Sequence, residues 1–248
     1  MQTLHCKGGK NQVHAFERLH RRIQEKTENP AAKPVTYVAI GDSVTQGAME
    51  LGVIEHKQVY HQLLRLRIAK RYPNCILNVI NAGASGETAD QSRKRWERDV
   101  LRFDPDLVTI KFGLNDAHEG EQGLDKFIRS IEDLIYQIRT KTEADLLLLT
   151  PNMMMKKENP RIAEGHRHHI PRFVQLHEQG HLARYVEALR TFAAEQSVPL
   201  LDAYAMWESM EQEGIDIHDR LANGINHPDR QFHEQLAASM EQFLFNQS

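Results

Sequence analysis

The hydrophobic positions of this chain fall into five short runs that are separated by longer amphipathic stretches. The runs are almost continuously apolar and rich in Val, Ile and Leu, which is typical of strands buried on both faces of a parallel sheet. They are "VTYVAI" (35–40), "ILNVINA" (76–82), "DLVTIKF" (106–112), "ADLLLLT" (144–150) and "VPLLDA" (198–203). Helical periodicity lies between and after them, at 57–71, 88–99, 122–141, 181–196 and 229–244. This alternation predicts an α/β fold, a parallel sheet with helices on both faces.

One more amphipathic stretch precedes the first run. Between residues 11 and 27, apolar side chains recur at helical spacing among Arg, Lys and Glu, and the prolines of "TENPAAKP" end the pattern. We therefore predict an amphipathic helix and linker over residues 1–33, packed on the outside of the domain. An oligomer contact, giving a homo-oligomer, is the alternative for the same face.

The stretch 151–180 interrupts the alternation. It is rich in Met and His, carries prolines and has no clean period. Long segments of this kind in compact domains are often functional. We predict an insertion or lid on a domain that spans residues 34–248.

Composition restricts the class of protein. The 248 residues fit one α/β domain, and 40% hydrophobic residues suffice for a normal core. The net charge of -3 offers no basic surface for nucleic acid. Cys6 and Cys75 show neither metal spacing nor a disulfide framework, which favours reduced thiols. There is no apolar run of membrane-spanning length and no signal-like apolar stretch at the N-terminus, so we expect a cytoplasmic protein without a membrane span.

Polar and small residues follow the first three runs. The first run ends in Gly41-Asp42-Ser43, the second is followed by "NAGASGETA", and the third by "GLNDAHEG". Because ligands of open parallel sheets bind at the carboxyl ends of the strands, these segments are expected to share one site. The "GDS" turn alone is also compatible with a helix cap, whereas a phosphate loop is excluded by the spacing from Gly41 to Gly47 and by the lack of a lysine.

Four short blocks in this order resemble those of the SGNH hydrolases, the GDSL esterase/lipase superfamily. They are Gly41-Asp42-Ser43, the glycine of "SGET" (Gly86), Gly113 to Asp116, and His227 before Pro228. The resemblance runs from about residue 35 to 245. It implies a three-layer α/β/α sandwich with a five-stranded parallel sheet in flavodoxin-like order.

The resemblance also implies residue roles. Ser43 would be the nucleophile and His227 its base, and the oxyanion hole would consist of the Ser43 and Gly86 N–H groups and the Asn115 side chain. The family usually places an aspartate three residues before the histidine, but that position is Gly224 here. We therefore expect a Ser43–His227 dyad, with Asp219 or a main-chain carbonyl orienting the imidazole.

These roles predict a serine esterase that needs no cofactor and no metal. The polar, His-rich segment 151–180 favours a small-molecule ester with a short acyl group, such as acetyl, on a sugar or another polar alcohol. A thioesterase or lysophospholipase, with Met153 to Met155 lining an acyl pocket, is the alternative within the class. The missing aspartate leaves a catalytically silent binding domain as an alternative of another class.

A second motif points to different chemistry. "HEQGH", from His177 to His181, matches the H-E-x-x-H pattern of zinc proteases, which requires both histidines on one face of a helix. Gly180 lies inside the pattern, and position 184 is Arg where the extended motif has His. We expect no zinc protease here. Adventitious metal binding by these histidines and His166, His168 and His169 remains an alternative.

Overall fold

A computed structural model describes residues 16–245 of the chain and shows one parallel sheet. Its five strands stand in the order β2-β1-β3-β4-β5, which is the flavodoxin-like order. The strands are β1 (Val35–Gly41), β2 (Leu77–Gly83), β3 (Leu107–Lys111), β4 (Asp145–Leu149) and β5 (Leu200–Leu201). Each coincides with one of the five runs, with β1 and β2 extending one residue past the end of theirs, and all of them pair in parallel. The predicted fold class is confirmed.

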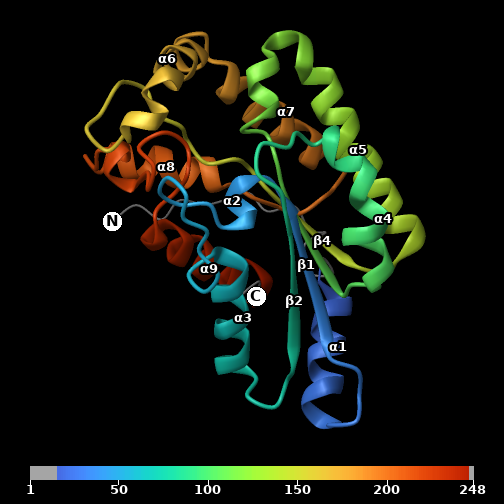
Figure 1. The fold of residues 1–248 in the computed structure, drawn as a ribbon. Coiled ribbons are helices and arrows are strands. Elements are labelled where there is room, and N and C mark those ends of the chain that lie inside the picture. Colours follow the sequence, from blue (N-terminus) through green and yellow to red (C-terminus); the bar gives the residue numbers. More distant parts are fainter. Residues whose placement is uncertain (1–15, 246–248) are drawn as a thin grey trace.

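Helices cover both faces of the sheet (Figure 1). On one side lie α2 (Ser43–Gln46), α3 (Tyr60–Arg71), α8 (Ala203–Gln212) and α9 (Arg230–Phe245). On the other side lie α1 (Glu17–Glu28), α4 (Trp96–Asp99), α5 (Leu124–Lys141) and α7 (His181–Glu195). The central strands β1 and β3 are buried between these layers, in keeping with their apolar sequences. This is the three-layer α/β/α arrangement expected from the sequence.

The N-terminal helix is attached to the strands by polar contacts as well as by its apolar face. Leu19 and Ile23 of α1 are buried. The Leu19 N–H donates to Asp145 Oδ2 at 2.7 Å, and Arg18 Nε lies 3.0 Å from Asp106 Oδ1. The part of the predicted helix before residue 16, with Cys6, lies outside the described residues. Within residues 16–245 no helix is both long and apolar enough to cross a membrane.

The segment 151–180 contains helices that the sequence pattern did not predict. A 3₁₀ helix, η6 (Glu164–His169), runs into α6 (Ile170–Glu178) near the carboxyl ends of the strands (Figure 1). Pro171 lies in the first turn of α6, where its missing N–H costs no hydrogen bond, so it does not break the helix. The apolar face consists of buried Phe173 and Leu176 with partly buried Ile170 and Val174, in a helix of nine residues that is too short to show a clear period.

Two other helical predictions need correction. The expected helix over 88–99 is a 3₁₀ helix, η2 (Gln91–Arg95), followed by the single turn of α4. Helix α8 was not predicted, because its apolar residues continue directly from the run at 198–203. Three more 3₁₀ helices connect the elements, namely η3 (Leu101–Phe103), η4 (Asp116–Glu119) and η5 (Glu121–Gly123), and η7 (Ile217–Arg220) precedes the C-terminal loop.

Candidate active site

Ser43 stands at a sharp turn between β1 and α2. Asp42 Oδ1 accepts a hydrogen bond from the Val44 N–H at 2.9 Å, so Asp42 caps the short helix that Ser43 begins. Gly41 leaves no room for a side chain, because a Cβ there would lie 2.2 Å from Thr45 Oγ1 and 2.5 Å from the Lys111 carbonyl oxygen. The turn therefore presents the Ser43 hydroxyl at the carboxyl end of β1.

His227 contacts Ser43 and the chain that follows α2 through its two ring nitrogens. Its Nε2 lies 3.1 Å from Ser43 Oγ, and its Nδ1 lies 2.9 Å from the carbonyl oxygen of Met49. A carbonyl only accepts, so the Nδ1–H must be the donor and Nε2 keeps its lone pair for the serine hydroxyl. Burial lowers the pKa of His227 below its ordinary value, which keeps the ring neutral and able to take a proton.

The loop that carries His227 is closed by a side chain. Asn223 Oδ1 accepts hydrogen bonds from the N–H groups of Ile225, Asn226 and His227, at 2.9, 2.9 and 3.0 Å. Asn223 is buried, so these bonds are protected from water. The sequence pattern did not predict this role of Asn223.

The predicted oxyanion donors come from the next two strand ends. Gly86 lines the same cavity as Ser43 and has φ +77, a conformation that favours glycine. Asn115 also lines the cavity, and its Nδ2 donates to the Glu87 carbonyl oxygen at 3.0 Å. The amide has a second N–H besides the one used in this bond. Asp116 joins the two loops, since its carboxylate accepts from the Ala89 N–H at 2.8 Å and the Gly113 N–H at 3.0 Å.

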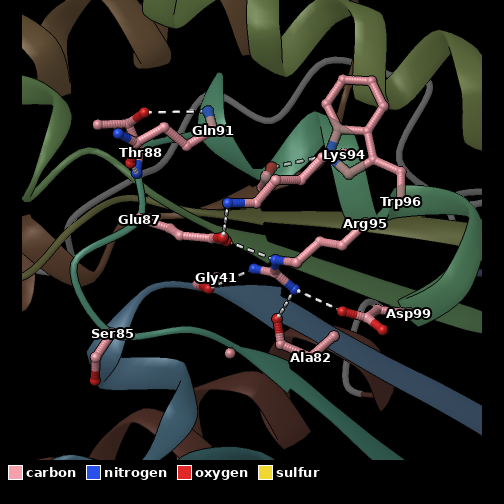
Figure 2. A network of polar contacts seen from close by, with 12 residues as sticks. Gly41, Ala82, Ser85, Glu87, Thr88, Gln91, Lys94, Arg95, Trp96 and Asp99 are labelled. Carbon is pink, nitrogen blue, oxygen red and sulfur yellow. Dashed lines mark hydrogen bonds and ion pairs between the residues drawn. The ribbon is translucent and has the colours of Figure 1, made fainter.

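Arg95 connects the turn that carries Ser43 to the loop that carries Gly86 (Figure 2). Its guanidinium is buried, and it donates to the Gly41 carbonyl at 3.2 Å and the Ala82 carbonyl at 2.6 Å. Its Nε donates to Glu87 Oε2 at 2.6 Å. Glu87 follows Gly86 directly and its carbonyl holds Asn115, so one side chain ties together the segments carrying all three oxyanion donors. Nothing in "QSRKRW" distinguishes Arg95 from its basic neighbours.

A buried lysine lies behind the nucleophile turn. Lys111 ends β3, is fully buried, and donates from Nζ to Asn152 Oδ1 at 3.1 Å. Asn152 in turn donates to the Asn226 carbonyl at 2.9 Å, next to His227. Burial lowers the pKa of Lys111 to about 8, and the charge of Asp42 opposes that shift. Burial likewise raises the pKa of Asp42 while Lys111 opposes it, so the two groups stabilise each other's charged form.

A model of the GDSL-like lipase/acylhydrolase family, which comprises ester-hydrolysing serine hydrolases, matches residues 39–235. The chain belongs to this family.

Individual relatives agree with the assignment. An acetylxylan esterase of Geobacillus stearothermophilus is 28% identical over 128 residues, which are 45% of this chain and 57% of that protein. The chain thus spans only about half the length of the curated relatives it matches. A lipase/acylhydrolase of Enterococcus faecalis has the same fold, with a TM-score of 0.63 and 26% identity over 84% of this chain and 95% of that one. The structure of an acetylxylan esterase from G. stearothermophilus has a TM-score of 0.64 at 20% identity, and the match covers 85% of this chain and 94% of that one.

The position of the usual family aspartate cannot hold a side chain here. Gly224 has φ +72, and a Cβ would lie 2.8 Å from the Ile162 nitrogen and 2.9 Å from the Arg161 carbonyl carbon. Asp219, one of the two predicted orienting groups, does not contact His227. Its side chain is 69% exposed and pairs with Arg161 at 3.2 Å. The prediction of Asp219 as the orienting acid is therefore wrong, and the main-chain carbonyl of Met49 contacts the imidazole instead.

Two further sequence motifs lie apart from the dyad. Met153 to Met155 are buried and line a different cavity, of about 150 Å³, with Leu176 and Tyr204. The H-E-x-x-H pattern is divided between two helices, because α6 ends at Glu178, Gly180 has φ +66, and α7 begins at His181. Among the residues described, no group of three or more His, Cys, Asp or Glu side chains could hold a metal ion.

Proposed function

We propose that this family member is a serine esterase that hydrolyses short acyl esters, acetyl esters above all, of a sugar or another polar alcohol. The observation that carries the proposal is the 3.1 Å contact between His227 Nε2 and Ser43 Oγ at a cavity of about 540 Å³. A neutral, correctly oriented imidazole beside a serine hydroxyl is the arrangement that nucleophilic acyl transfer requires.

The reaction would pass through an acyl-enzyme. His227 Nε2 takes the hydroxyl proton as Ser43 Oγ attacks the ester carbonyl, and the negative charge develops on the carbonyl oxygen. Donors from Ser43, Gly86 and Asn115 would stabilise that oxygen, and one such donor contributes about 3–4 kcal/mol. The bond to the alcohol then breaks as His227 returns the proton to it. A water, deprotonated by the same imidazole, releases the acid and restores Ser43.

The cavity lining supports a polar alcohol. Phe173 and Ile225 are the two large apolar side chains that line it, and the remaining lining residues are polar or glycine. Such a set of side chains offers many hydrogen-bonding groups to a hydroxylated substrate. The name of the acetylxylan esterase relative points to the same substrate class. The separate location of Met153 to Met155 removes the feature that motivated a long-chain thioesterase or lysophospholipase.

The test is a series of initial rates on p-nitrophenyl esters from acetate to palmitate. We expect the acetate ester to be hydrolysed fastest and Ser43→Ala to lose nearly all turnover. Ser209→Ala, which replaces an exposed serine on α8 that does not line the cavity, is the matched control. A fluorophosphonate should label wild type but not Ser43→Ala. A folded wild-type protein that neither turns over any ester nor takes the label would instead support a binding domain.

A further inference from the structure

One wall of the cavity that contains Ser43 is strongly basic. His118 comes from η4, His166 and His169 from η6, and Arg172 from the first turn of α6, and all four line the cavity. The one acidic side chain in the lining, Glu119, is already neutralised, because its carboxylate lies 2.5 Å from Lys126 Nζ. The basic wall, as we call these four residues, therefore lacks a counter-charge.

Arg172 differs from the other basic side chains of the same segment. Lys156 pairs with Glu211, Arg161 with Asp219, and Arg167 with Glu158. Arg172 has no ion pair or hydrogen bond with any residue between 16 and 245. It is exposed at the cavity, so its guanidinium is available to a ligand.

The histidines of the wall are also short of partners. Nδ1 of His166 is buried without a hydrogen-bond partner in the described part of the chain. Burial, Arg172 and His169 together lower the pKa of His118 to about 4. Burial and the neighbours His168, His166 and Arg172 lower the pKa of His169. The four groups therefore repel one another's charged forms, and no acid at the wall relieves that repulsion.

Arg172 thus carries the fixed positive charge of the wall, and a bound oxyanion would favour protonation of the neighbouring imidazoles. We propose that the basic wall is an oxyanion subsite, and that the alcohol part of the substrate carries a carboxylate or phosphate that Arg172 and the neighbouring imidazoles bind. Planar guanidinium groups bind both of these oxyanions through paired N–H donors. This inference rests on the proposed esterase function, since it assigns the substrate class of the same cavity.

The subsite would act on the leaving group and not on the acyl group. The oxyanion donors come from the ends of β1, β2 and β3, whereas His166, His169 and Arg172 come from η6 and α6. An anion held by Arg172 is thus bound by a segment that supplies none of the oxyanion donors. It would lower KM for charged substrates and leave the chemistry at Ser43 unchanged.

A pair of acetyl esters tests the proposal. 3-Acetoxybenzoate carries a carboxylate and 3-acetoxybenzamide is its neutral, nearly isosteric counterpart, with rates corrected for their hydroxide-catalysed hydrolysis. We expect wild type to prefer the carboxylate in kcat/KM and Arg172→Gln to reduce that preference about tenfold, through KM. Arg172→Lys should keep most of the preference, because it keeps the charge. Arg167→Gln is the matched control, since Arg167 is on the same segment but does not line the cavity.

Competition identifies the oxyanion. Glucuronate and glucose 6-phosphate should inhibit hydrolysis of 3-acetoxybenzamide more strongly than glucose, and the stronger of the two indicates whether the group is a carboxylate or a phosphate. Equal hydrolysis of both esters by wild type and Arg172→Gln, without inhibition by either anion, would overturn the subsite while the esterase stands. Failure of wild type to hydrolyse either ester or p-nitrophenyl acetate would overturn the esterase proposal itself.

Discussion

At the scale of single residues, the notable feature of the site is that a carbonyl and not a carboxylate holds the imidazole. Ser43 begins α2 and Met49 follows its end, so the two nitrogens of His227 contact opposite ends of this short helical segment. The carbonyl fixes the tautomer as an aspartate would. It places no full negative charge beside the imidazolium that forms during catalysis, so the cation gains less stabilisation than in a full triad.

Because Asp219 does not contact His227, its removal should leave the activity unchanged. We predict that Asp219→Ala keeps kcat/KM for p-nitrophenyl acetate within about twofold of wild type, because its exposed pair with Arg161 contributes only about 0–1 kcal/mol to stability. Arg161→Gln, which breaks the same ion pair from the other side, serves as the control. A loss of a hundredfold or more in Asp219→Ala alone would restore this carboxylate to a catalytic role.

At the scale of elements, the site depends on loops from several strand ends being held in register. The buried Arg95 does this for β1, β2 and the loop that contains Gly86 (Figure 2). A lysine would keep the charge but has a single nitrogen, which cannot satisfy two carbonyls and a carboxylate at their present separations. The oxyanion donors would then lose their fixed positions.

We predict that Arg95→Lys lowers kcat for p-nitrophenyl acetate at least about tenfold with little change in KM, the pattern of a loss felt in the transition state. Lys94→Gln is the control, because Lys94 contacts the same Glu87 at 3.3 Å but is 72% exposed. Steady-state kinetics, with circular dichroism to verify folding at the assay temperature, measure this. A parallel fall in kcat for both variants would mean that Glu87 neutralisation, and not the position of the strand ends, is what matters.

A second prediction at this scale concerns the loop that carries His227. Gly224→Ala must adopt φ +72 and push its Cβ against the backbone of residues 161 and 162. We expect it to lose about 2–4 kcal/mol of stability, from strain plus overpacking, and most of its activity. Gly180→Ala has a similar φ of +66 but meets nothing within 4 Å, so only about 1 kcal/mol should be lost. Urea unfolding of both variants compares them, and equal losses would show that backbone strain alone decides.

At the scale of the whole molecule, much could be predicted from the sequence. The apolar runs predicted all five strands because a buried parallel strand has a distinctive composition, and the resemblance to the SGNH hydrolases predicted Ser43, Gly86, Asn115 and His227. The structure brings all four to one cavity. Met49 could not be predicted, because a main-chain carbonyl is the same in every residue. Arg95 could not either, since one arginine in "RKR" gives no sign of burial.

The packing of α3 against α9 makes stability depend on pH. His233 of α9 is fully buried and accepts from the Tyr60 N–H at 3.2 Å. Burial, with the charges of Lys111, His61, His227 and Arg230, lowers its pKa to about 3. Above pH 6.5 the group is neutral in both the folded and the unfolded chain. Below it, only the unfolded chain takes up the proton, so this histidine costs stability as the pH falls from 6.5 towards 3.

At pH 5 the cost is about 2 kcal/mol, from roughly 1.5 pH units at 1.36 kcal/mol each. Buried carboxyls act in the opposite direction, since burial raises the pKa of Asp116 to about 7 and of Asp145 to about 6. The contribution of His233 is therefore isolated by difference. His233→Gln, whose amide oxygen can still accept from Tyr60, should lose about 2 kcal/mol less than wild type in urea unfolding between pH 7.5 and 5. His56→Gln, an exposed control, should lose as much as wild type, and a His233→Gln profile parallel to both would show that α9 admits the proton without unfolding.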